Sequence, residues 1–165
     1  MTINTSISTD LEKLGYGGPA GCIAVGAHRQ IITEATATRT LLAKESGSLC
    51  LFDRAAGTVY TLPAPVKGMW FEFCTSVACT SNAHKVQTDG ASTFILGSVM
   101  IGSLTVADSG DVFQANGSSH VGISSDGATK GGLIGGSYKL VAISSTVWQI
   151  EGDLVGSGTV ADPFV

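Results

Sequence analysis

The chain has 165 residues, of which 44% are hydrophobic and only 13% are charged, and its nine basic and thirteen acidic side chains give a formal net charge of -4. The charged share is about half that of a typical soluble domain, and the basic residues form no cluster that could neutralise several phosphates, so we expect no nucleic-acid partner. No window is long and apolar enough to span a bilayer, so we expect no membrane partner either. The length predicts a single domain.

Residues 1–20 are predicted to form an extended N-terminal arm. Their apolar residues stand alone among Thr, Ser and Gly, which argues against a helix, although the spacing would permit one or two turns. Such a segment cannot form a core of its own, so it is either disordered or ordered on a partner. It also lacks a basic stretch followed by an apolar run, so we expect no signal peptide. The candidate interface residues are Ile3, Ile7, Leu11, Leu14 and Tyr16.

From Cys22 to Glu151 the sequence is typical of short β-strands with almost no helix. The runs are rich in Val, Ile, Thr and aromatic residues, and turn residues such as Asp126-Gly127 separate them. This pattern predicts an all-β fold, an antiparallel β-sandwich or jelly-roll-like single domain over residues 21–155, followed by an extended tail at residues 156–165. The predicted strands cover residues 22–27, 30–42, 48–52, 58–62, 69–77, 84–88, 93–101, 111–115, 120–124, 138–144 and 146–151.

The segment 46–73 has the most informative order of elements. Apolar runs at residues 49–52 and 59–62 flank a turn that ends at Gly57, which predicts a β-hairpin. A Thr-Leu-Pro-Ala-Pro sequence then ends the second strand, because proline cannot donate to a β-ladder. A glycine and the densest aromatic cluster of the chain follow, which predicts a third strand.

The residues that carry this order are turn, small and aromatic residues, and they continue beyond residue 73. The residues concerned are Ser46, Gly47, Gly57, Thr61, Leu62, Pro63, Gly68, Trp70 and Phe73, then Thr80, Ser81, Asn82 and Ala83, then Phe94, Leu96 and Gly97. Over about residues 41–101 the pattern resembles a module of structural proteins of tailed bacteriophages, among them capsid decoration (cement) proteins and head or tail fibre proteins. The resemblance implies a role in building the virion and no reaction.

Alternation along residues 69–77 predicts which side chains are buried. The odd positions from Met69 to Val77 share one face, while Trp70 and the other even positions share the second. Both faces are partly apolar, so one can fill the core, and the other is better covered by a loop, an arm or a neighbouring subunit than by water. The residues expected to supply most of the aromatic core are Trp70, Phe71, Phe73 and Trp148.

The sequence offers no catalytic, cofactor or metal site. Its four cysteines and three histidines do not lie at zinc-ligand spacings, so we interpret the cysteines as free and mostly buried thiols. A Ser-His-Asp triad can be assembled on paper, but no G-x-S-x-G motif supports it. Close acidic pairs such as Glu151 with Asp153 are interpreted as solvated turn residues. We therefore expect a protein that is not an enzyme and needs no cofactor.

These patterns lead to a structural hypothesis. We expect a virion protein, made in the host cytoplasm, that decorates the outer capsid surface and stabilises the assembled capsid by bridging capsomers. Its expected partners are the major capsid protein and further copies of itself, most simply in a homotrimer, because so low a surface charge suits a chain that lies against other proteins. The alternative is a fibre-tip or receptor-binding domain that recognises a host surface glycan. The absence of an internal repeat of solenoid length argues against a long fibre.

Overall fold

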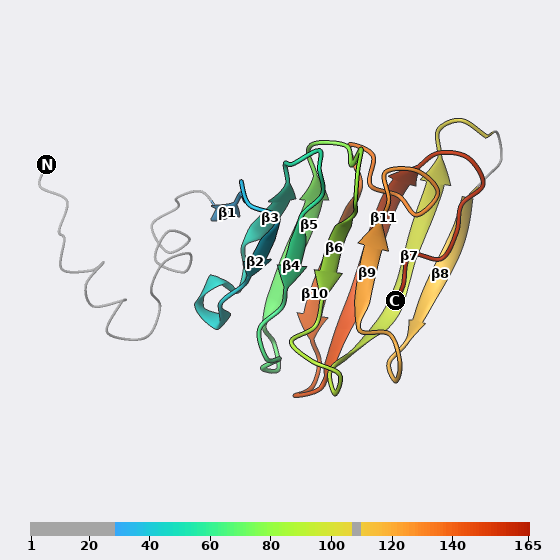
Figure 1. The fold of residues 1–165 in the computed structure, drawn as a ribbon. Helices are drawn as coiled ribbons and strands as arrows, with labels where there is room; N and C mark the ends of the chain where they lie inside the picture. The colour runs from blue at the N-terminus through green and yellow to red at the C-terminus, as the bar shows by residue number, and fades with distance from the viewer. Residues whose placement is uncertain (1–28, 107–109) are drawn as a thin grey trace, which may run out of the picture.

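The structure is a computed structural model that describes residues 29–106 and 110–165. Within these residues the chain is almost entirely β, as predicted, with one turn of 3-10 helix (Figure 1). The elements are β1 (Ile31–Ile32), β2 (Thr38–Thr40), η1 (Ala43–Glu45), β3 (Leu49–Phe52), β4 (Val59–Thr61), β5 (Trp70–Thr75), β6 (His84–Gln87), β7 (Phe94–Ser103), β8 (Gly110–Asn116), β9 (Gly122–Ser125), β10 (Ser137–Ala142) and β11 (Val147–Gly156).

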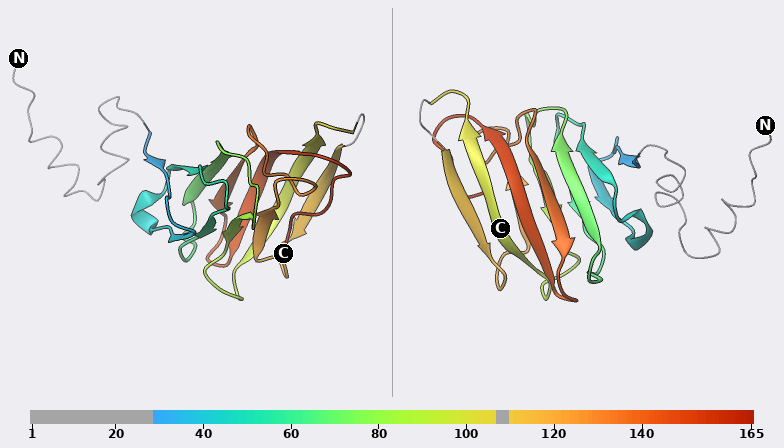
Figure 2. Two further views of the ribbon diagram at one scale, coloured as in Figure 1. Left: turned by 45° about the horizontal axis from the view of Figure 1, so that its top comes forward. Right: turned by 180° about the vertical axis from the view of Figure 1, so that it is seen from behind.

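The described strands form two sheets that pack against each other. The larger sheet has seven strands in the order β1-β3-β5-β10-β11-β7-β8, and the smaller has four in the order β2-β4-β6-β9. Figure 2 shows the two layers from above and from behind, where the larger sheet forms one broad face of the molecule. The apolar residues between the layers form a single buried cluster.

The prediction of an antiparallel arrangement is wrong, because both sheets are mixed. Among the described strands, β1-β3, β3-β5, β2-β4, β4-β6 and β7-β11 pair in parallel. The four antiparallel pairs are β5-β10, β10-β11, β7-β8 and β6-β9. From β1 to β6 the chain crosses to the opposite sheet after every strand and therefore re-enters each sheet in the same direction. The jelly-roll part of the prediction is not confirmed.

The same crossing corrects two local predictions. The expected hairpin at residues 49–62 does not form, because β3 belongs to the large sheet and β4 to the small one. The long strand expected at residues 30–42 is divided into β1 and β2, also on opposite sheets. Between them the Glu34 carboxylate accepts hydrogen bonds from the backbone N–H and the hydroxyl of Thr36, which stabilises a bend. Period-2 patterning shows that a strand is present but does not show which layer it joins.

The buried side of β5 is as predicted. Phe71 and Phe73 are fully buried, and so is Trp148 on β11. Trp70 is different: it is half-buried on the outer face of the large sheet, so its assignment to the core is wrong. The core instead gains Tyr60 from β4, whose hydroxyl donates to the carbonyl of Leu51 at 2.9 Å and so links the two sheets.

The C-terminal residues complete the smaller layer. After β11 the chain returns to lie beside β9, where Phe164 forms an antiparallel bridge with Ile123 (Figure 1). The carbonyl of Pro163 accepts a hydrogen bond from the N–H of Ser124, and the carbonyl of Val165 accepts one from the N–H of Gly122. Because Phe164 is buried in the core cluster, this tail covers apolar surface that the four-stranded sheet leaves open.

Candidate functional site

The outer face of the seven-stranded sheet carries the most unusual combination of exposed side chains. Strand pairing places Glu72 of β5 beside Lys139 of β10, and Lys139 beside Glu151 of β11. The row continues through Ser98 to Gln114 at the far edge. Because side chains alternate between the faces of a strand, these residues all point away from the core. The result is a charged and polar row across five neighbouring strands.

Trp70 lies next to this row and is held by two cations. The guanidinium carbon of Arg29 and the ammonium nitrogen of Lys139 each lie 4.9 Å from the centroid of the indole ring, within the range of a cation–π interaction. Arg29 is itself held by an ion pair with Glu72 at 2.7 Å and by hydrogen bonds to the carbonyls of Gly47 and Ser48. The outer aromatic residue therefore fixes the positions of two positive charges.

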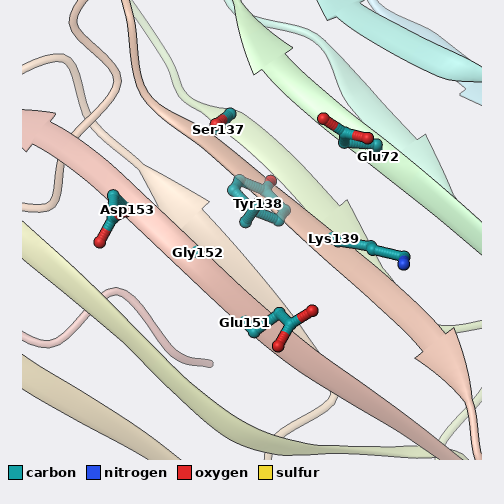
Figure 3. Close-up of a pocket in the computed structure, with 7 residues that line it drawn as sticks. All are labelled: Glu72, Ser137, Tyr138, Lys139, Glu151, Gly152 and Asp153. Atoms are coloured by element: carbon teal, nitrogen blue, oxygen red, sulfur yellow. The ribbon is translucent and has the colours of Figure 1, made fainter.

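A shallow hollow of about 200 Å³ lies in the middle of the polar row (Figure 3). Gly152, which has φ +153° and pairs with Tyr138, is one of its lining residues; both alternate toward the core, so the side chains that point outward around the hollow are those of Ser137, Lys139, Glu151 and Asp153. A Cβ at Gly152 would clash with the backbone of Ser137 and Tyr138, which requires glycine here. The residues that line the hollow are Glu72, Ser137, Tyr138, Lys139, Glu151, Gly152 and Asp153.

Several polar side chains of the hollow have unused hydrogen-bonding capacity. Within the described part of the chain, the side chains of Ser137, Lys139, Glu151 and Asp153 make no hydrogen bond, whereas Glu72 is engaged by Arg29. The Asp126 carboxylate, by contrast, accepts from the backbone N–H groups of Ala128 and Lys130. In Figure 3 the side chains of Glu72, Lys139, Glu151 and Asp153 project from three neighbouring strands, with Lys139 and Asp153 directed to opposite sides. The hollow can therefore offer both donors and acceptors to a ligand.

An apolar strip lies at the other end of the same face, toward β8. Met100 of β7 pairs with Val112 of β8, and their side chains are 49% and 60% exposed. Leu96 on β7 and Leu104 and Val106 just after it are also exposed. We call these five residues the β7–β8 strip. Met100 and Val112 are direct neighbours, whereas Ser98 and Gln114 of the polar row separate them from Leu96. Exposed apolar side chains gathered at one end of a chain with so little charge are typical of a protein interface.

The backbone edge of β8 is partly blocked. The N–H of Val112 donates to a carboxylate oxygen of Asp111 at 2.7 Å, and the N–H of Asn116 donates to Nδ1 of His120 at 3.1 Å. These two N–H groups are therefore engaged by side chains and are not free to pair with a further strand. Edge strands commonly use charged side chains in this way to avoid unwanted pairing. Association at this end of the molecule is thus expected to use the face of the sheet and not its edge.

The thiols of the described cysteines are poorly suited to chemistry. Cys50, Cys74 and Cys79 are free, and Cys50 and Cys79 are buried. Burial raises the pKa of Cys50 to about 12 and also raises the pKa of Cys74 and of Cys79, so at neutral pH all three stay protonated. Across residues 29–106 and 110–165 no group of three or more His, Cys, Asp or Glu side chains is placed to hold a metal ion.

The site differs from the one expected from the sequence. The predicted interface residues Ile3, Ile7, Leu11, Leu14 and Tyr16 lie outside the described residues, as does the predicted strand 22–27. Sequence reasoning missed the polar row because it ended the last strand at Glu151. β11 continues to Gly156, so Glu151 and Asp153 lie on the strand and not in a turn. The alternation in Gln149, Glu151 and Asp153 was the available signal, since it places three polar side chains on one face.

The comparisons with known proteins add no relative. No protein-family model matches the chain, and neither the curated proteins nor the solved structures contain a significant match. In the part of the chain that the structure describes, no helix has the length and apolar character needed to cross a membrane.

Proposed function

We propose that the protein is a structural component of a tailed-phage virion that decorates the assembled capsid and stabilises it by bridging capsomers. In this proposal the two packed sheets form a β-sandwich body, and residues 1–20 form an extended arm that orders on a partner. The partners are the major capsid protein and two further copies of the chain on the outer capsid surface. A protein that binds only the assembled shell stabilises that state by mass action.

The observation that supports this proposal best is the β7–β8 strip. Burial of exposed apolar side chains such as Met100 and Val112 lowers the free energy of association by about 25 cal/mol per Å² of apolar surface removed from water. The blocked edge of β8 directs such an association to the sheet face. We assign the strip to contacts between copies of this chain and the arm residues Ile3, Ile7, Leu11, Leu14 and Tyr16 to contacts with the capsid or with a neighbouring copy.

The test combines native mass with binding to undecorated phage heads. Replacement of Met100 by Gln and Val112 by Thr in one variant makes the strip polar with little change in shape. We expect this variant to remain folded, to lose the oligomer and to sediment poorly with heads. Val66→Thr is the control, because Val66 is equally exposed but lies in the loop between β4 and β5.

Two results would overturn the proposal. The first is failure of the unmodified protein to sediment with undecorated heads. The second is a double variant that keeps the native mass and the head binding of the unmodified protein, which would remove the strip from the argument.

A further inference from the structure

We propose that the hollow around Gly152 binds one residue of a neutral oligosaccharide on the outer face of the large sheet. The inference is independent of whether the protein decorates capsids, because it concerns Lys139, Glu151 and Asp153 in the middle of the face and not the β7–β8 strip. The proposed site also gives a specific location to the glycan recognition that the sequence offered as the alternative function.

Charge selects the class of ligand. Arg29 pairs with Glu72, and strand pairing places Lys139 between Glu72 and Glu151, with Asp153 further along β11. The two unpaired carboxylates would repel a phosphate or sulfate group. The ammonium group of Lys139 in the same row disfavours a divalent cation. A neutral polyhydroxyl compound suits both kinds of group, since each of its hydroxyls can donate to a carboxylate and accept from Lys139 or Ser137.

The size and shape of the hollow limit how much of the ligand it holds. About 200 Å³ is less than the roughly 300–1,000 Å³ of pockets that enclose drug-sized ligands. The hollow lies on an open sheet face, so a chain of sugars can enter and leave it. Gln149, Ser98 and Gln114 extend the polar surface toward β8 and offer amide and hydroxyl groups to neighbouring residues of such a chain.

Trp70 acts as a positioning residue in this site. Its ring lies under the ammonium group of Lys139, which limits the freedom of this flexible side chain and holds its donors at the Trp70 end of the hollow. Trp70 also provides a reporter, because it is the half-buried tryptophan next to Lys139 whereas Trp148 is fully buried in the core. Ligand binding that moves Lys139 is therefore expected to change the fluorescence of Trp70.

The experiment is a titration of tryptophan fluorescence with the full chain. The probes are linear oligosaccharides of glucose, galactose, mannose and N-acetylglucosamine, with inorganic phosphate and Ca²⁺ as separate arms. We expect at least one oligosaccharide series to give a saturable change. Lys139→Ala and Glu151→Gln should each weaken binding at least about tenfold, the loss expected for a hydrogen bond to a charged group. Trp70→Phe should abolish the fluorescence change.

Matched variants separate the site from general effects of charge. Lys67→Ala and Asp89→Asn remove exposed charges in loops and should bind like the unmodified protein. Asp153→Asn leaves the aromatic and basic groups in place and should also weaken binding. The proposal is wrong if none of the four oligosaccharide series binds, if only phosphate or Ca²⁺ binds, or if Glu151→Gln and Asp153→Asn fold normally and bind as tightly as the unmodified protein. If the unmodified protein binds sugar but does not sediment with undecorated heads, the capsid role alone is refuted.

Discussion

His84 of β6 stacks on Phe52 of β3 across the interface between the two sheets, with ring centroids 4.6 Å apart and planes inclined by 29°. Its Nε2 donates to the carbonyl of Val77 at 3.0 Å, while its buried Nδ1 has no hydrogen-bond partner among the described residues. The neutral ring fits this environment because a proton on Nδ1 would be a buried donor without an acceptor. Desolvation accordingly lowers the pKa of His84 below its ordinary value of 6.5.

This environment predicts loss of stability in mild acid. Above about pH 6.5 the ring is neutral in both the folded and the unfolded chain, so His84 adds no dependence on pH. Below that pH the unfolded chain binds a proton that the folded protein does not, so the free energy of unfolding falls until the folded-state pKa is passed. We expect urea denaturation at a series of pH values to show this decrease, and His84→Gln, which keeps a donor toward Val77, to reduce it. Equal slopes for both proteins would assign the effect to other groups.

Phe73→Ala is expected to be severely destabilising. Phe73 is fully buried and stacks on Tyr138, with ring centroids 5.4 Å apart. Truncation of a buried phenylalanine costs about 3–5 kcal/mol, because it removes apolar contacts and leaves a cavity. Asp126→Ala removes hydrogen bonds in an exposed turn and should cost about 1 kcal/mol. The measurement is thermal unfolding of both variants, and equal decreases in melting temperature would show that the inward face is misassigned.

Gly97→Ala is expected to disrupt the pairing of β7 with β11. Gly97 has φ +125°, and a Cβ there would overlap the carbonyl oxygen of Ile150 on the neighbouring strand. The strained backbone alone costs about 1–3 kcal/mol, and the overlap adds to it. Gly102→Ala is the matched control, since Gly102 lies on the same strand and a Cβ there meets no atom within 4 Å. Chemical denaturation should show a large loss for the first variant and little change for the second.

Asp111→Ala is expected to increase self-association through the edge of β8. The change frees the N–H of Val112, which then becomes available to a strand of another molecule. Sedimentation velocity over a range of protein concentrations should reveal larger species than those of the unmodified protein. Asp89→Ala removes the same charge from an exposed turn and serves as the control. If both variants behave alike, net charge and not the blocked edge governs association.

Deletion of residues 1–14 tests the arm. Because the described residues from Ile32 to Phe164 already form a buried core cluster, we expect the truncated protein to keep its β circular dichroism spectrum. It should bind phage heads more weakly or have a smaller native mass, since a segment that orders on a partner contributes to the interface and not to the core. Unchanged head binding and unchanged mass would falsify the role of the arm.

The sequence by itself determined the strands and their buried sides. Ten of the eleven predicted strands overlap observed ones, because alternating apolar residues and turn-forming glycines are local signals. The burial of Phe71 and Phe73 followed from the same alternation. These features depend on residues a few positions apart, and no knowledge of the rest of the chain is needed to find them.

Only the tertiary structure decided which strands are neighbours. Crossing between layers turned the expected hairpin at residues 49–62 into two strands of different sheets, and parallel pairing of β11 with β7 placed Glu151 beside Ser98. The hollow exists because Glu72, Lys139 and Glu151 meet from three strands that are far apart in the sequence. Pairing of distant strands depends on how the whole apolar surface can be buried at once, which no local pattern specifies.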